Sequence, residues 1–302
     1  MNHGTMAHLD GFQYGWVNPV VAYVIASAGA AIGLRCTARA LTLEPRQRFG
    51  WLALAAGAFG CGIWSMHFIA MLGFMVDSST LVYDIPLTLL SLFVAIVVVG
   101  LGIGYVGYRE NRTSTLLTSG VLTGCGVAAM HYIGMAAMQV EGAVSYAVLP
   151  VVASVAIAIA AATAALWMTL HVKGLPAALG AALVAGVAVV AMHYTAMTAV
   201  TVTLDGRPAG TGVAASQFIL PLAVGIVVVL TVAGIAIAIS PQDPEPGSRP
   251  APEPIRIDLF AQERQAQQER QAQQEHWPQQ EHWPQREYRT QQEHRTADAN
   301  HR

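Results

Sequence analysis

Charged side chains are scarce in this sequence: only 11% of its 302 residues are Asp, Glu, Lys or Arg, whereas 54% are hydrophobic. A soluble globular domain carries about 25% charged residues, so this composition argues against that class. The polar residues are also unevenly spread, because residues 1 to about 240 hold nearly all of the apolar character. The sequence therefore predicts a membrane body followed by a polar tail.

Several further absences exclude whole classes of protein. The net charge of -2 gives no support to a nucleic-acid partner. The three cysteines, Cys36, Cys61 and Cys125, have spacings that match neither a disulfide framework nor a CxxC site. The only lysine, Lys173, lies in a predicted loop, which excludes a retinal Schiff base in the last helix. No Lys or Arg precedes the first apolar run, so we expect that run to stay in the membrane rather than to be cleaved as a signal peptide.

Seven hydrophobic stretches are long enough to cross a bilayer core, which needs roughly 20 apolar residues of helix. We therefore predict an all-α membrane protein with three regions: an N-terminal segment 1–16 outside the membrane, a seven-helix domain 17–240, and a tail 241–302. The predicted spans are 17–40, 50–76, 84–108, 115–139, 146–170, 176–202 and 214–240.

The predicted loops differ in charge, and this difference predicts the orientation. Basic residues concentrate in the first, third and fifth loops, while acidic residues dominate the opposite side. By the positive-inside rule, the basic loops are cytoplasmic, the N-terminus is outside and the C-terminal tail is inside. The basic residues are Arg35, Arg39, Arg46, Arg48, Arg109, Arg112 and Lys173, and the opposite side carries Asp10, Asp77, Asp84, Glu141, Asp205 and one Arg207.

One motif occurs in the second, fourth and sixth predicted spans, centred on His67, His131 and His193. The separations are 64 and 62 residues, so the chain contains an internal repeat of two-helix units plus one extra helix. Each copy has Gly seven residues before the His, Met one before it, an aromatic residue one after and Met four after. The three copies read GCGIWSMHFIAMLGF, GCGVAAMHYIGMAAM and GVAVVAMHYTAMTAV.

The spacing within the motif predicts that ligands gather on one helix face. Residues four apart on a helix lie on the same side, so each His pairs with the Met that follows it: His67 with Met71, His131 with Met135 and His193 with Met197. The Met before each His is rotated by about 100°, and Met66, Met130 and Met192 are either second ligands or packing residues.

The depth of the histidines predicts a common site. Each His lies 16 or 17 residues after the predicted cytoplasmic start of its helix, a rise of about 25 Å in a core of about 30 Å. All three are therefore expected near the outer face, where they can meet if their helices are neighbours. The glycine two turns earlier allows a neighbouring helix to approach closely.

Imidazole and thioether groups, with no acid in the same helices, favour copper, especially Cu(I). Zinc is less favoured, because methionine is not among its usual ligands. A catalytic zinc site would also need a nearby general acid or base, and the nearest carboxylates, Asp77 and Asp84, lie in or beside an outer loop. We therefore predict a copper site and no enzymatic activity.

The tetrapeptides MHYT at 192–195, MHYI at 130–133 and MHFI at 66–69 resemble the signature of the MHYT-domain family of bacterial integral membrane sensors. The resemblance covers roughly residues 10–240. It implies a multi-pass protein of the bacterial plasma membrane that binds copper through these Met and His residues and detects oxygen, carbon monoxide or nitric oxide. It also implies a cytoplasmic signalling partner, because many relatives carry cytoplasmic output domains.

The tail departs from that pattern. A Pro-rich linker after Ser240 leads into six polar hexapeptide repeats beginning at Glu263, and such a composition cannot pack a core. The function predicted from the sequence is therefore a copper-dependent sensor of a diatomic gas or of redox state. A transporter for copper or a small solute is the alternative, although transport calls for further ligands deeper along a path.

Overall fold

The computed structural model describes residues 5–6, 9–10, 14–76, 81–109, 113–172, 174–204 and 210–239, together with residues 267, 270 and 271, which are helical. The chain divides into two units, Met1–Ser240 and Pro241–Arg302. Apart from those three residues, the predicted tail lies outside the described residues. Of the predicted N-terminal segment 1–16, only residues 5–6, 9–10 and 14–16 are described.

The first unit contains seven helices that are long and apolar enough to cross a membrane. This confirms the predicted seven-helix membrane fold. The helices are α1 (Val17–Thr42), α2 (Pro45–Met71), α3 (Ile85–Tyr108), α4 (Thr113–Ala137), α5 (Val148–His171), α6 (Leu175–Met197) and α7 (Ala215–Ile239).

Six of the helices form a closed ring. Each of α1 to α5 packs against the next helix in sequence, and α6 packs back against α1. Helix α7 contacts α1 and α2 and does not join the ring. The even-numbered helices α2, α4 and α6 carry the repeated motif, so the ring presents the motif from every second helix. Three two-helix units plus one helix is the arrangement that the internal repeat predicts.

The motif glycines bring neighbouring helices of the ring into close contact. A Cβ atom on Gly60 would lie 2.8 Å from the backbone of Ile96 on α3, and one on Gly124 would lie 2.4 Å from the backbone of Ile159 on α5. On Gly186 it would meet Ser27 and Tyr23 of α1. Each glycine therefore allows its own helix to pack on the next odd-numbered helix around the ring, which is α1 for α6.

Local signals explain where several helices begin. The Asp84 side chain accepts a hydrogen bond of 2.8 Å from the Leu87 amide, which caps the start of α3. Proline occupies the first turn of α2, α3 and α6, where no intrahelical N–H bond is lost. Gly174, with φ of 80°, turns the chain into α6.

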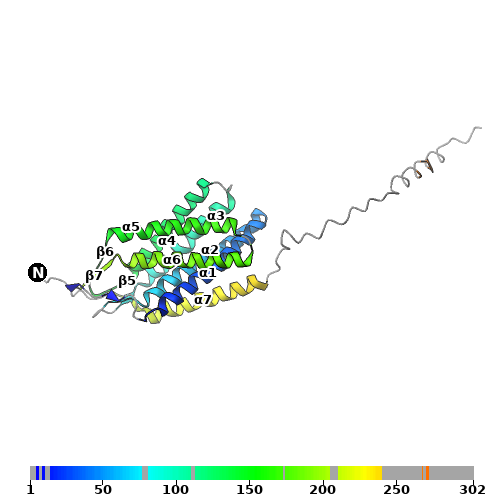
Figure 1. Ribbon diagram of the computed structural model, residues 1–302. Helices are drawn as coiled ribbons and strands as arrows, with labels where there is room; N and C mark the ends of the chain where they lie inside the picture. Colours follow the sequence, from blue (N-terminus) through cyan, green and yellow to red (C-terminus); the bar gives the residue numbers. More distant parts are fainter. Residues whose placement is uncertain are drawn as a thin grey trace, which may run out of the picture. The chain divides into compact units, whose positions relative to one another are not determined.

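Short strands lie at one end of the bundle (Figure 1). It is the end at which the motif helices α2, α4 and α6 finish. The strands form three small antiparallel sheets, with the orders β1-β7-β6, β2-β3 and β5-β4-β8. We refer to them together as the strand cap. The strands are β1 (Thr5–Met6), β2 (Leu9–Asp10), β3 (Met75–Val76), β4 (Val82–Tyr83), β5 (Met138–Gln139), β6 (Ala143–Tyr146), β7 (Val200–Leu204) and β8 (Val213–Ala214).

The strand cap corrects three predicted helix ends. The predicted spans 50–76, 115–139 and 176–202 run too far, because α2, α4 and α6 end at Met71, Ala137 and Met197. The residues beyond these ends pair as strands instead. In the sixth span, the sequence VTVTL alternates β-branched residues, which suit a pleated strand better than a helix. Helix α2 also begins earlier than predicted, at Pro45.

Candidate metal centre

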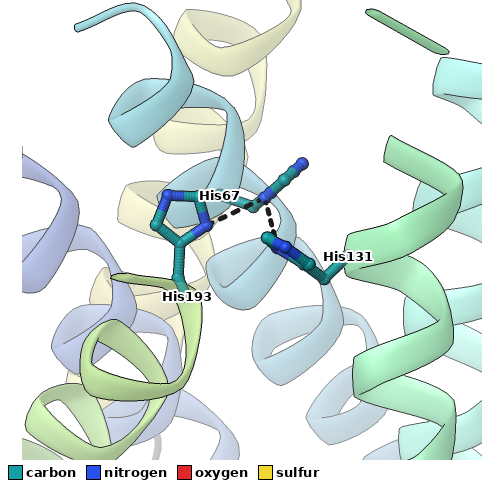
Figure 2. A group of neighbouring side chains, drawn as sticks. All are labelled: His67, His131 and His193. Atoms are coloured by element: carbon teal, nitrogen blue, oxygen red, sulfur yellow. Dashed lines mark hydrogen bonds between the residues drawn. The ribbon is translucent and has the colours of Figure 1, made fainter. Parts of the chain in front are cut away.

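His67, His131 and His193 meet on the axis of the ring, one from each motif helix (Figure 2). We call them the histidine triad. The Nδ1 atom of His67 lies 3.1 Å from the Nδ1 atoms of both His131 and His193. All three candidate ligand atoms lie within 4.8 Å of one another. Each side chain is only 1% exposed. Helices that are far apart in sequence therefore bring three imidazoles to one buried point.

The three rings are arranged almost symmetrically. Their centroids are 4.8, 5.1 and 5.2 Å apart, and each pair is edge to face. Because His67 lies close to both partners through one atom, it is the central member. His67 and His193 lie four residues before the ends of α2 and α6, which places the triad in the last turns of these helices, beneath the strand cap.

The aromatic residue after each histidine packs edge-on against it. The ring centroids are 4.7 Å apart for His67 and Phe68, 4.9 Å for His131 and Tyr132, and 5.1 Å for His193 and Tyr194. Two of these rings also reach the strand cap. The ring centroids are 6.0 Å apart for Phe68 and Tyr83 on β4, and 5.8 Å apart for Tyr132 and Tyr146 on β6. The cap and the triad are therefore in contact through aromatic side chains.

Hydrogen bonds alone satisfy the triad poorly. One ring nitrogen holds either one proton or one lone pair, so Nδ1 of His67 can make only one full hydrogen bond with its two neighbours. The Nε2 atoms of His67 and His131 have no hydrogen-bond partner among the described residues. A buried polar group left unpaired costs about 1–3 kcal/mol.

A metal ion fits the Nδ1 atoms well. A metal holds imidazole nitrogens at about 2.0–2.1 Å, which places two ligands of a tetrahedral site about 3.3 Å apart. The two Nδ1 distances of 3.1 Å are close to this spacing. One ion could therefore bind His67 Nδ1 together with a nitrogen of each neighbour, since all three candidate ligand atoms lie within 4.8 Å of one another, whereas a single proton or lone pair on His67 Nδ1 serves only one neighbour.

Five of the six motif methionines are buried, and the six occupy three kinds of position. Met71 and Met135, each four residues after its histidine, are 1% exposed and belong to the main hydrophobic core, while Met197 is half-buried against it. Met130 and Met192 are also in the main core. Met66 packs elsewhere, in a small cluster with Ala22 and Ala26 of α1. Among the His, Cys, Asp and Glu side chains of the described residues, the three histidines form a group that could hold a metal ion, and the ligand role of the methionines stays a prediction.

Two supports of the triad were not identified in the sequence. Gly134, three residues after His131, faces His67, and a Cβ atom there would lie 2.5 Å from His67 Nε2. The other two motifs have Ala70 and Ala196 at this position, and that difference was the available signal. Trp64 is fully buried, packs on Phe68 at 4.6 Å, and donates a hydrogen bond of 2.9 Å to Ser91 on α3. It precedes Phe68 by one helical turn, a spacing typical of a side-chain pair.

Comparison with protein families identifies the repeat. The profile of the family MHYT, described as a bacterial signalling protein N-terminal repeat, matches residues 60–119, 124–182 and 186–247. Each match begins at the motif glycine of an even-numbered helix. Together the three matches cover more than half of the chain.

Three curated proteins are each similar to this chain over about half of its length. A bifunctional diguanylate cyclase/cyclic di-GMP phosphodiesterase, MucR of Pseudomonas aeruginosa, is 36% identical over 161 residues, 53% of this chain and 23% of the relative. A signalling protein of Caulobacter vibrioides is 35% identical over 147 residues, 49% of this chain and 18% of the relative. The cyclic di-GMP phosphodiesterase NbdA of P. aeruginosa is 32% identical over 180 residues, 55% of this chain and 23% of the relative.

The chain thus spans less than a quarter of the length of the curated relatives it matches. No solved structure matches it.

Proposed function

This chain belongs to the MHYT family of bacterial signalling proteins, and we propose that its membrane bundle is a sensor that binds copper at the histidine triad. The observation that carries the proposal is the convergence of three buried imidazoles, in which His67 Nδ1 lies 3.1 Å from Nδ1 of both partners and all three candidate ligand atoms lie within 4.8 Å of one another. The stimulus is a diatomic gas, namely oxygen, carbon monoxide or nitric oxide, or a change of redox state. A cytoplasmic partner protein reads the response.

The residues around the triad support copper over other metals. Among the described residues no carboxylate is buried, which disfavours magnesium, calcium and manganese. Three imidazoles suit both copper and zinc, and the buried thioethers of Met71 and Met135 favour copper. His67, His131 and His193 would hold the ion, which would supply a site for a gas ligand or for electron exchange. The three aromatic neighbours exclude water and orient the imidazoles.

The proposed orientation of the bundle in the membrane follows from the distribution of its basic residues. We place the bundle in the bacterial plasma membrane, with the triad and the strand cap near the outer face and the C-terminus in the cytoplasm, because the basic residues Arg35, Arg39, Arg46 and Arg48 lie at the opposite end of α1 and α2. We also propose that the chain has no catalytic activity of its own. In the described part of the chain, the triad has no buried carboxylate beside it to act as a general acid or base.

Metal content tests the proposal directly. We expect the purified wild-type protein, reconstituted with Cu(I), to retain one copper ion per chain, whereas the triple variant with His67, His131 and His193 replaced by alanine retains none. Plasma mass spectrometry after removal of free metal measures both. A His171→Ala variant is the control, because His171 is exposed and stacks on Trp167 instead. Equal copper in the wild type and the triple variant, or zinc alone in the wild type, would contradict the copper assignment.

Gly134 offers a test that removes no ligand. In a Gly134→Ala variant the new Cβ atom needs the space that His67 Nε2 occupies, 2.5 Å away, so the His67 ring must move. We expect copper affinity to fall by about 10- to 100-fold, the usual effect of losing a residue that orients a ligand. Competition with a Cu(I) chelator measures the affinity, and thermal melting checks the fold.

The control for Gly134 is Gly57→Ala on α2, where a Cβ atom meets nothing within 4 Å. Copper affinity in Gly134→Ala that equals the affinity in Gly57→Ala would show that the position of the His67 ring does not matter for binding.

Transport of copper or of a small solute is the second candidate. A transport path needs several ligands in series along the axis. The residues below the triad, on the axis of the ring, are apolar apart from two threonines, and Met192 is the only thioether among them. A sensor is therefore the better supported function.

A further inference from the structure

A cavity of about 70 Å³ lies inside the ring, directly below the histidine triad, and all six ring helices line it. Its position follows the internal repeat. The residues four and eight positions before each histidine face the cavity from the three motif helices. These residues are Ile63 and Phe59 on α2, Val127 and Thr123 on α4, and Val189 and Ala185 on α6. The cavity is therefore one to two helical turns from the imidazoles.

The lining is unsuited to water. Thr123 and Thr169 are its only polar residues. The Thr169 hydroxyl donates a hydrogen bond of 2.8 Å to the Ala165 carbonyl, so it could serve a water only as an acceptor. A buried water typically makes about three hydrogen bonds, within a range of two to four. The Thr123 hydroxyl, which has no partner among the described residues, could supply one. An apolar occupant is thus favoured over water.

The volume limits the occupant to a small molecule. An apolar cavity of about 150 Å³ engineered in another protein stays dry and binds xenon or benzene. The cavity here is about half that size, which suits two or three heavy atoms and excludes an aromatic ring. We propose that this cavity is a binding site for a small apolar molecule, such as a diatomic gas, separate from the histidine ligands themselves.

The structure also indicates how such a molecule enters. The strand cap lies at one end of the bundle (Figure 1), directly after the last turns of α2, α4 and α6, which carry the triad. The half-buried lining residues come mainly from α5 and α6: Ala161, Ala162 and Ala165 on α5 and Ala185 and Val189 on α6. Small side chains leave this seam the least covered wall of the cavity. Because apolar molecules transfer favourably from water into hydrocarbon, the ligand enters from the bilayer between α5 and α6.

We expect the cavity to bind its ligand whether or not the triad holds copper. Only the further role of the cavity, as a store of ligand beside a bound metal, rests on the proposed function. An occupant would lie against Met192 and within one helical turn of His193. The repeat thus gives the three motif helices two layers, imidazoles above and an apolar chamber below.

Xenon is the probe for this site, because it is apolar and of suitable size. The experiment uses the full chain in nanodiscs without added metal, and ¹²⁹Xe exchange measured by NMR detects a saturable site. We expect saturable xenon binding in the wild type and its loss in Ala162→Met, whose flexible side chain fills the cavity. Ala185→Met fills it from α6 and should behave in the same way.

The matched control is Ala164→Met, the same change two residues away on the exposed face of α5, which should bind xenon as the wild type does. Absence of saturable xenon binding in the wild type overturns the proposal. So does wild-type xenon binding in folded Ala162→Met and Ala185→Met. Copper content, measured on separate samples of the same variants reconstituted with Cu(I), separates this outcome from failure of the metal site, because the filled cavity leaves all three histidines in place.

Discussion

Replacing His67 by alanine is expected to abolish tight copper binding, with a larger loss of affinity than replacing either of the other two histidines. His67 Nδ1 is 3.1 Å from both partners. His131→Ala leaves the Nδ1 contact of 3.1 Å between His67 and His193 in place, whereas His67→Ala removes the atom that both Nδ1 contacts share. Loss of a direct ligand should exceed the 10- to 100-fold effect of losing an orienting neighbour.

The measurement is a competition titration of each single variant against a Cu(I) chelator, with His171→Ala as the control for removal of a histidine elsewhere. We expect an affinity loss of more than about 100-fold for His67→Ala, with smaller losses for His131→Ala and His193→Ala. If the three single variants lose affinity equally, His67 is not the central ligand. If His67→Ala binds copper as the wild type does, the triad is not the copper site.

The sequence predicts the triad well because the repeat imposes the same geometry three times. Equal spacing puts each histidine at an equivalent place on its helix, and the motif glycines lie where a neighbouring backbone comes within 2.4–2.8 Å of a Cβ atom on Gly60 and Gly124. The unequal roles of the three histidines could not be predicted in the same way. The position of the His67 ring requires that residue 134, on another helix, has no Cβ atom, because one there would lie 2.5 Å from His67 Nε2. A motif comparison treats that position as an ordinary small residue.

The sequence predicts the ends of the helices and the packing contacts of the methionines less well. A hydrophobic run does not distinguish the last turn of a membrane helix from a buried strand, so Val200 and Val202 were assigned to a helix although they pair in β7. The Met before each histidine points along a different face from the His, and only tertiary packing decides its neighbours: Met66 lies against α1, whereas Met192 lines the cavity. The cavity depends on side-chain volumes from six helices at once.

Among the three motif glycines, the largest loss of stability is expected from Gly124→Ala. A Cβ atom there would lie 2.4 Å from the Cα atom of Ile159 and 2.6 Å from its nitrogen. Both atoms belong to the backbone of α5, so no rotation of a side chain relieves the clash and the two helices must separate. Overpacking of this kind costs about 1–3 kcal/mol and occasionally more, and we expect a value near the upper end. Thermal unfolding in detergent, followed by far-UV circular dichroism, measures the loss.

Substitutions at two further glycines allow the melting temperatures of three variants to be ranked. Gly186→Ala should destabilise the bundle less, because its new Cβ atom meets side-chain atoms of Ser27 and Tyr23, which can shift. Gly180→Ala on α6 meets nothing within 4 Å and should leave stability unchanged or raise it slightly, since alanine favours a helix over glycine by about 1 kcal/mol. The expected order of melting temperature is therefore Gly180→Ala, then Gly186→Ala, then Gly124→Ala. If Gly124→Ala has the same melting temperature as Gly180→Ala, then α4 and α5 do not pack through Gly124. The placement of His131 on the ring axis would then be wrong as well.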